Sequence, residues 1–361
     1  NQHFQLAKKI FSGLKINFKL LTGKTDSGEK KEILNNLRKN KINLIFGTHA
    51  LFQKKTEFNK LGFIIIDEQH KFGVKQRMAL SKKGGKNCDI LLMSATPIPR
   101  TLMLTVFGDM DVSRLLEKPS NRKDVITLSK PEAKIHEIID YIKKEIKNKN
   151  QIFWVCPLID ESKKLDYQSA KIKYDYLNNI FPENVGLIHG ALKKEERESV
   201  LIKFLKKKIL ILVSTTVIEV GIDFPNANII IIENSNKFGL SQLHQLRGRV
   251  GRSNKQGVCI LLFKKNLSEN AKERLKILKS TNDGFKISEE DMRLRGFGDL
   301  LGYKQSGIKD FRLADPIHHE DLFSFAEKNI KKIELNKKNL EKFKPLLKLY
   351  DRANIIEEIG S

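Results

Sequence analysis

The sequence has few cysteines and no long apolar run. Its three cysteines, Cys88, Cys156 and Cys259, lie far apart, so no two have zinc-ligand spacing and three cannot all pair in disulfides. We therefore expect a reduced, cytoplasmic chain. The longest apolar runs, around 209–213 and 229–232, have the length of strands. A membrane-spanning helix needs a much longer run, so we expect no contact with a membrane.

Acidic residues are outnumbered by basic ones. The chain has 67 Lys and Arg against 43 Asp and Glu, a formal net charge of +24. This excess favours a polyanionic partner, and nucleic acid is the commonest polyanion. A composition rich in Lys, Asn and Ile throughout, without any binding role, is the alternative explanation of the same charge.

Short apolar runs alternate with amphipathic stretches, which predicts an α/β fold built on parallel sheets. The segment 193–207 is typical of a helix, because Val200, Leu201, Phe204 and Leu205 form an apolar stripe opposite charged residues. Buried strands are expected at 41–46, 62–66, 90–93, 152–156, 186–189, 209–213, 229–232 and 258–263.

The order of the elements predicts three domains. The polar, proline-containing segment 116–123 is typical of a linker between two α/β blocks. After residue 264 the strand pattern stops and helices with glycine-rich loops follow. We expect a first α/β domain at 1–120, a second at 121–265 and a mostly helical region at 266–361.

A pair of acids follows one of the predicted strands. Residues 63–70 read FIIIDEQH, so Asp67 and Glu68 stand at the carboxyl end of a buried strand, the edge at which ligands bind in open α/β sheets. Asp67 is suited to hold Mg²⁺ and Glu68 to orient or deprotonate an attacking water. A strand that simply ends in solvated acids is the alternative.

Two later segments place hydroxyl groups at strand ends. In LMSATPIPRTL, residues 92–102, Ser94, Ala95 and Thr96 follow a strand and can relay the state of a bound nucleotide. In STTVIEVGIDFPNA, residues 214–227, hydroxyls are followed by a glycine and then an acid. Taken alone, the first of these segments is better explained as an ordinary turn with two prolines.

Three arginines are separated by glycines in QLHQLRGRVGRS, residues 242–253. Arg249 and Arg252 are spaced to reach a γ-phosphate, as arginine fingers do. The alternative is a solvated basic helix. Glycine in a helix interior costs about 1 kcal/mol relative to alanine, so two glycines favour a functional reason.

In this order and spacing, the four segments resemble motifs II, III, V and VI of superfamily 2 helicases. The resemblance implies two RecA-like domains, the first incomplete, with ATP and Mg²⁺ bound between them. Gly47-Thr48-His49 resembles the DNA-contacting motif Ib, and His189-Gly190 resembles the loop before a helix of the second domain.

The resemblance implies three groups of site residues. The catalytic group comprises Asp67, which would also hold the metal, with Glu68, Gln69, His70, Arg249 and Arg252. The group that couples ATP to movement comprises Ser94, Ala95, Thr96, Gly221, Asp223 and Gln245. The DNA-binding group comprises Thr48, His49, Thr215, Thr216, Arg295 and Gln305.

The flanks of these motifs are similar to RecG-type DNA helicases. DEQHKFGVKQR, residues 67–77, carries part of the similarity. Residues 283–307, DGFKISEEDMRLRGFGDLLGYKQSG, resemble the translocation motif that RecG shares with the transcription-repair coupling factor. The chain departs from the usual RecG pattern at Phe297, where proline is common, and at Asp299, where glutamate is common.

A phosphate-binding loop is missing from the sequence. Thr22–Thr25 reads TGKT, but Gly-x-x-x-x-Gly-Lys-Ser/Thr would need a glycine where the chain has Phe18. The segment instead resembles a loop downstream of the phosphate-binding loop in RecG. We therefore expect that loop and the wedge domain of RecG to lie upstream, and the chain alone not to hydrolyse ATP.

The resemblance implies a monomeric, ATP-dependent DNA helicase that acts on branched and double-stranded DNA in recombination and repair, associated with the nucleoid. Within enzymes, the alternative is the translocase of a transcription-repair coupling factor. A non-catalytic nucleic-acid-binding module is a further alternative, although it has no reason to keep both the acids and the arginines. His318 and His319 lack a third ligand at suitable spacing, so we expect exposed histidines rather than a metal site.

Overall fold

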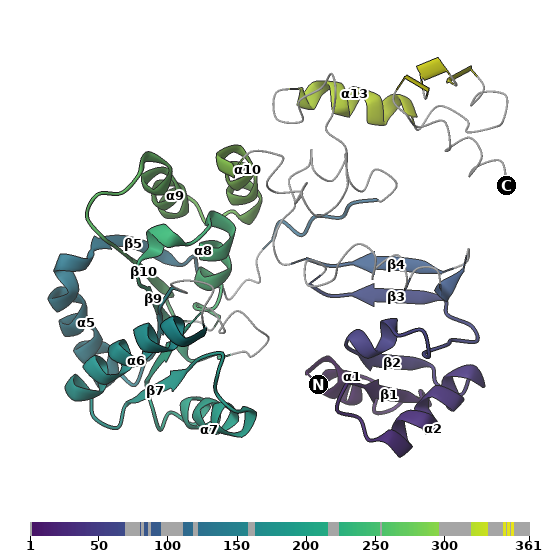
Figure 1. Cartoon of the computed structure of the whole chain (residues 1–361), viewed down its shortest axis with the longest axis horizontal. Coiled ribbons are helices and arrows are strands. Elements are labelled where there is room, and N and C mark those ends of the chain that lie inside the picture. The colour runs from purple at the N-terminus through teal and green to yellow at the C-terminus, as the bar shows by residue number, and fades with distance from the viewer. Residues whose placement is uncertain are drawn as a thin grey trace. The chain divides into compact units, whose positions relative to one another are not determined.

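In a computed structural model, the chain folds into two compact units, Asn1–Ala95 and Thr96–Ser361. Each unit is described by itself, and Figure 1 shows the elements of both. The structure describes residues 2–68, 80, 83–85, 88–94, 111–117, 122–157, 163–215, 224–252, 255–295, 319–330, 342–343, 345–346 and 348–349.

The first unit contains two pairs of parallel strands. β1 pairs with β2 and β3 pairs with β4, each pair in a separate two-stranded sheet. Its elements are α1 Gln2–Ile10, β1 Phe18–Leu21, α2 Ser27–Arg38, β2 Leu44–Gly47, the 3-10 helix η1 His49–Phe52, β3 Phe63–Ile66 and β4 Asp89–Leu92.

The short helix η1 contacts the cores of both strand pairs. Ala50 is buried in the cluster that β1 and α2 form around Leu21 and Ile33. Phe52, two residues later, packs against the second cluster, which includes Ile64 of β3. The segment that follows β2 is therefore held between the two halves of this unit.

The prediction that residues 63–66 form a fully buried strand was wrong in part. Ile64 and Ile66 are buried, but Phe63 and Ile65 are each 54% exposed. Side chains alternate between the two faces of a strand, so one face of β3 packs on the core and the other is open. The continuous apolar run could not reveal this difference.

The second unit contains a six-stranded parallel sheet with the order β5-β10-β9-β6-β8-β7. Its strands are β5 Ile126–Pro131, β6 Gln151–Val155, β7 Val185–Ile188, β8 Ile211–Ser214, β9 Ala227–Ile232 and β10 Val258–Phe263. Its helices include η3 Glu132–Lys134, α5 Ile135–Lys147, α6 Lys163–Ile180, α7 Lys194–Leu205, η5 Ser235–Lys237, α8 Leu240–Arg247, α9 Glu269–Ser280, α10 Gly284–Arg295 and α13 Glu320–Ile330.

Helices cover both faces of this sheet, as Figure 1 shows. On one face, α5 and α6 pack around Trp154 of β6. On the other, α7 to α10 pack around Phe153, the neighbouring residue of the same strand. Every residue of β6, β8 and β9 is buried, as expected for the central strands of a parallel sheet.

Helices α9 and α10 pack onto the same core as the sheet. Leu275 and Leu278 of α9 and Ile287 of α10 belong to the hydrophobic cluster that includes Phe153. The predicted division near residue 266 therefore falls at the end of β10, but the two helices share the core of the domain before it. The domain limits stay a prediction.

Two strands of the described part of the chain were not predicted. β1 has the mixed sequence FKLL, and β5, ITLSKP, lies at the edge of its sheet with Ile126 exposed. Within the predicted helix at 193–207, Phe204 is fully buried, whereas Leu205 is 44% exposed and does not join the core. No helix of the described residues is long and apolar enough to span a bilayer.

We expect the substitution Ile142→Ala to destabilise the second unit. Ile142 of α5 is fully buried against the sheet. Truncation of a buried isoleucine costs roughly 2–5 kcal/mol, since it removes apolar contact and leaves a cavity. The control is Ile172→Ala on α6, because Ile172 is 69% exposed. Chemical denaturation should separate the two variants, and equal midpoints would contradict the assigned core.

Candidate functional site

Three of the predicted site residues lie at one edge of the β3–β4 sheet. The strands are parallel, with Ile66 opposite Leu92. Asp67 and Glu68 follow β3, and Ser94 follows β4, so all three stand at the carboxyl edge. In the sequence, each of the two apolar runs is followed by polar residues, which predicted that these side chains stand at strand ends.

Asp67 makes two polar contacts. Its Oδ1 accepts a hydrogen bond from the backbone N–H of Glu68 at 2.9 Å, and its Oδ2 lies 3.2 Å from Nε2 of His3. Glu68 has a φ of 52°, the left-handed region that non-glycine residues rarely adopt and that often marks functional sites. Nothing in the sequence indicated that His3, on α1, would contact Asp67.

The surroundings of Asp67 fit a magnesium ion that takes few protein ligands. The Asp67 side chain is 47% exposed, so a carboxylate oxygen can reach a ligand in solvent. Mg²⁺ commonly uses one or two carboxylates and fills its other positions with water and phosphate oxygens. Within the described residues, no three His, Cys, Asp or Glu side chains form a metal cluster, and His319 belongs to none.

The arginine segment forms a helix followed by a turn, as predicted, but its glycines are not in the helix interior. Helix α8 ends at Arg247, and Gly248 is its C-cap. Gly251 has a φ of 69°, and its Cα would lie only 2.9 Å from a Cβ added at Gly257. Both glycines therefore lie outside the helix, where one ends it and the other allows a left-handed turn close to a neighbouring backbone.

The predicted arginine fingers follow α8 directly. Arg249 is half-buried and Arg252 is exposed, with Nε of Arg252 donating to the backbone oxygen of Gly248 at 3.2 Å. Gln245, on the last turn of α8, is half-buried. The position of α8 therefore sets the position of both arginines.

Arg247 joins the end of α8 to the end of α9. Its side chain is almost fully buried, and Nη1 donates to the backbone oxygens of Leu278 at 2.6 Å and Thr281 at 2.9 Å. It also reaches Oγ1 of Thr127 and the ring of His244. Burial lowers the pKa of Arg247. A cation here satisfies carbonyls that a helix leaves without partners at its C-terminus.

A second set of contacts holds the start of α8. Ser241 donates from Oγ to Oδ2 of Asp291 at 2.6 Å, and Nε of Arg295 donates to Oδ1 of the same carboxylate at 3.0 Å. A Cβ added at Gly239 would lie 1.9 Å from Nη2 of Arg295, so the guanidinium packs directly against the residue that precedes this helix. Helix α10 is thereby fixed to the first turn of α8.

Arg274 of α9 adds to this attachment. Its two Nη atoms donate to the backbone oxygens of Phe238 at 2.8 Å and Asn236 at 3.0 Å, just before α8. Burial, with the nearby charge of Arg295, lowers the pKa of Arg274. Sequence reasoning identified Arg295 but not Arg274, Asp291 or Ser241.

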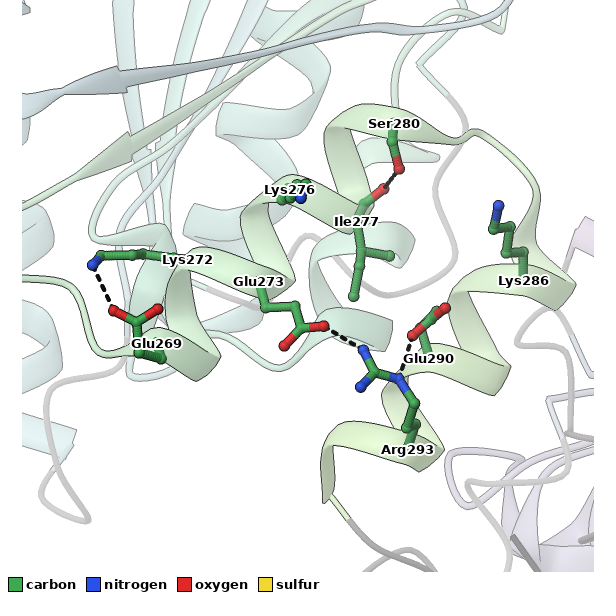
Figure 2. Close-up of a pocket in the computed structure, with 9 residues that line it drawn as sticks. All are labelled: Glu269, Lys272, Glu273, Lys276, Ile277, Ser280, Lys286, Glu290 and Arg293. Carbon is green, nitrogen blue, oxygen red and sulfur yellow. Dashed lines mark hydrogen bonds and ion pairs between the residues drawn. The ribbon is translucent and has the colours of Figure 1, made fainter. Parts of the chain in front are cut away.

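Helices α9 and α10 are also bridged on their outer side. Figure 2 shows Arg293 of α10 between Glu273 of α9 and Glu290 of its own helix, with Nε of Arg293 2.8 Å from Glu290. The two helices thus form a hairpin. An ion pair joins α9 to α10, and hydrogen bonds join both helices to α8 or to the residues just before it. A groove of about 460 Å³ runs along this side, lined by Glu269, Lys272, Glu273, Lys276, Ile277, Ser280, Lys286, Glu290 and Arg293.

The predicted DNA-binding residues differ in exposure. Thr48 and His49 are exposed at the start of η1. Thr215 is only 1% exposed, and Arg295 is paired with Asp291. A role for these residues in DNA binding stays a prediction. Gln69, His70, Ala95, Thr96, Thr216, Gly221, Asp223 and Gln305 lie outside the described residues.

Three protein-family models match successive parts of the chain. The DEAD/DEAH box helicase model matches residues 1–105, and the helicase conserved C-terminal domain matches residues 133–254. The model described as ATP-dependent DNA helicase RecG, domain 3, C-terminal, matches residues 281–345.

Two relatives with high sequence identity carry the same name. The ATP-dependent DNA helicase RecG of Thermotoga maritima is 45% identical over 92% of this chain, and that of Bacillus subtilis is 47% identical over 88%. The chain is therefore strongly homologous to RecG over about 90% of its length. It spans 43% and 46% of the length of those two relatives, so it corresponds to less than half of each.

Solved structures agree with this assignment. A structure of RecG bound to a three-way DNA junction has a TM-score of 0.68 and 42% identity, over 89% of this chain and 41% of that one. Yeast Dbp5 bound to RNA and ADP BeF3 has a TM-score of 0.54 at 17% identity, over 81% of this chain and 77% of that one, which supports the fold alone. The two parallel-sheet units are RecA-like helicase domains, as predicted.

We expect Arg247→Met to destabilise the second unit. Methionine keeps much of the apolar stem but leaves the carbonyls of Leu278 and Thr281 buried without their donor, which costs roughly 1–3 kcal/mol. Arg293→Met removes an arginine whose ion pairs are exposed, and exposed pairs contribute little. Thermal unfolding followed by circular dichroism should show a clear loss only for Arg247→Met. Equal losses would contradict a buried attachment.

Proposed function

We propose that this chain is part of an ATP-driven DNA translocase that remodels branched DNA, such as stalled forks and four-way junctions, in recombination and repair. The proposal is supported by the RecG relatives and by the RecG structure solved on a three-way DNA junction. We further propose that the protein acts as a monomer in the cytoplasm, near the nucleoid.

The acids after β3 would serve ATP hydrolysis. Asp67 would hold Mg²⁺, which neutralises charge on the phosphates of ATP. Glu68 would orient the attacking water and accept its proton. The left-handed backbone of Glu68 supports this role, since it aims the side chain in a direction that an extended residue would not allow.

The arginines after α8 would stabilise the negative charge that develops during phosphoryl transfer. Arginine suits this role, because its planar guanidinium stays charged and offers several donors to phosphate oxygens. Ser94 and Gln245 would respond to the state of the nucleotide. We propose the same for Ala95, Thr96, Gly221 and Asp223.

The observation that carries the proposal is the attachment of α8 to the hairpin at both of its ends. Arg274 and Asp291 hold the start of α8, and Arg247 holds its end. Any movement of Arg249 and Arg252 toward a phosphate would therefore be passed to α9 and α10. Such a connection is what a motor needs to convert ATP hydrolysis into displacement of DNA.

On the DNA side, the net charge of +24 favours contacts with phosphates. Exposed Thr48 and His49 would contact the backbone from the first unit. Thr215, Thr216, Arg295 and Gln305 are proposed to act from the second. Binding through phosphates should weaken as salt concentration rises.

We expect Glu68→Gln to abolish most DNA-stimulated ATP hydrolysis. The test uses a longer form of the chain that includes a phosphate-binding loop. Loss of a general base typically lowers a rate by about 10²–10⁴-fold, and glutamine keeps the shape without accepting a proton. DNA binding without ATP should be unchanged.

The matched control is Glu32→Gln, which makes the same chemical change at an exposed position of α2. It should leave hydrolysis at the wild-type rate. A Glu68→Gln variant that still hydrolyses ATP at that rate would contradict the assigned role. Wild-type protein that neither hydrolyses ATP nor unwinds branched DNA would contradict the proposed function as a whole.

A further inference from the structure

The ammonium group of Lys83 is surrounded by three backbone carbonyls from one loop. Nζ lies 3.0 Å from the oxygen of Leu51, 2.6 Å from that of Gln53 and 2.8 Å from that of Thr56. It also lies over the ring of Phe58. A lysine has three N–H donors, so these carbonyls use all of them.

Lys83 is attached to the half of the first unit that carries Asp67 and Glu68. It comes from the segment between β3 and β4. A Cβ added at Gly84 would lie 2.3 Å from Cβ of Cys88, so this glycine lets the chain pass directly against the start of β4. Leu80, three residues before Lys83, is buried in the core of β3 and β4.

The loop that Lys83 holds begins with the exposed residues Thr48 and His49. The N–H of Leu51 donates to the oxygen of Thr48, and the hydroxyl of buried Thr56 donates to the oxygen of Ala50 at 2.9 Å. The loop is therefore internally bonded from residue 48 to residue 56. Whatever fixes its second half also limits the movement of its exposed first half.

We propose that Lys83 is a positioning residue that fixes the Thr48–His49 loop relative to the strands that carry Asp67 and Glu68. The inference rests on the proposed function, in which this loop contacts DNA and those strands serve ATP hydrolysis. Lys83 then acts through the loop and does not itself bind DNA, because its donors already have partners.

Two single variants separate positioning from charge. Lys83→Met removes the three donors, and Lys55→Met removes the same charge from an exposed position of the same loop. We expect Lys83→Met to lower the affinity for duplex DNA by roughly 2- to 30-fold, the range seen for residues that act through others. Lys55→Met should change it less.

The dependence of affinity on salt excludes a direct phosphate contact. A lysine that neutralises a phosphate contributes about 0.9 to the slope of log affinity against log salt concentration. Lys83→Met should leave this slope at the wild-type value. A reduced slope would mean that Lys83 contacts DNA, which would overturn the proposal.

A double variant tests whether Lys83 acts through the loop. Thr48→Val replaces the exposed hydroxyl with a methyl group of similar size. If Lys83 positions Thr48, the effects of Lys83→Met and Thr48→Val on DNA affinity will be less than additive. Additive effects would show that the two residues act independently and would overturn the proposal.

Hydrogen exchange distinguishes failure of this inference from failure of the proposed function. Lys83→Met should speed exchange of the Leu51, Gln53 and Thr56 amides, whereas amides of α2 should keep their protection. Unchanged exchange in the loop would overturn the inference even if the wild type binds DNA. Faster exchange in a protein that does not bind DNA would confirm the attachment and reject its role in DNA binding.

Discussion

The attachment of the end of α8 to the end of α9 depends on one buried cation, Arg247. Arg247 is 2% exposed, and its buried guanidinium is stabilised by hydrogen bonds to the carbonyls at the end of α9, to Thr127 and to the ring of His244. Removal of either partner leaves a polar group buried without compensation, so helices α8 and α9 are held together. Arg249 and Arg252 follow α8 directly, so the buried contacts of Arg247 also restrict the positions of these two arginines.

The first unit uses backbone carbonyls in a similar way. In the first unit, Lys83 donates to three carbonyls of a loop. In the second unit, Arg247 donates to two carbonyls at the end of α9. The Lys83 attachment joins a loop that the proposed function assigns to DNA to the strands that it assigns to ATP hydrolysis. The Arg247 attachment joins the helix that precedes the proposed arginine fingers to the hairpin of α9 and α10. Each attachment consists of several hydrogen bonds to backbone carbonyls, so we expect movement of one segment to move the other.

The sequence predicted what depends on local pattern. Asp67 and Glu68 could be placed at a strand end because apolar runs followed by acids define that position. Arg249 could be identified from its spacing with the glycines. The partners of Arg247 could not be predicted, because they are backbone carbonyls, which every residue has, and because they belong to a helix that is distant in sequence. The exposure of Phe63 also escaped prediction, because an apolar run does not tell which face of its sheet is covered.

The central claim is that α8 passes the effect of ATP hydrolysis to the hairpin, and Arg274→Met tests it most directly. The measurement is the number of base pairs of branched DNA unwound per ATP hydrolysed, in a longer form of the chain that includes a phosphate-binding loop. We predict that the variant still hydrolyses ATP but unwinds far fewer base pairs per ATP. An unchanged ratio would contradict the claim, because hydrolysis and movement would then be coupled without this attachment.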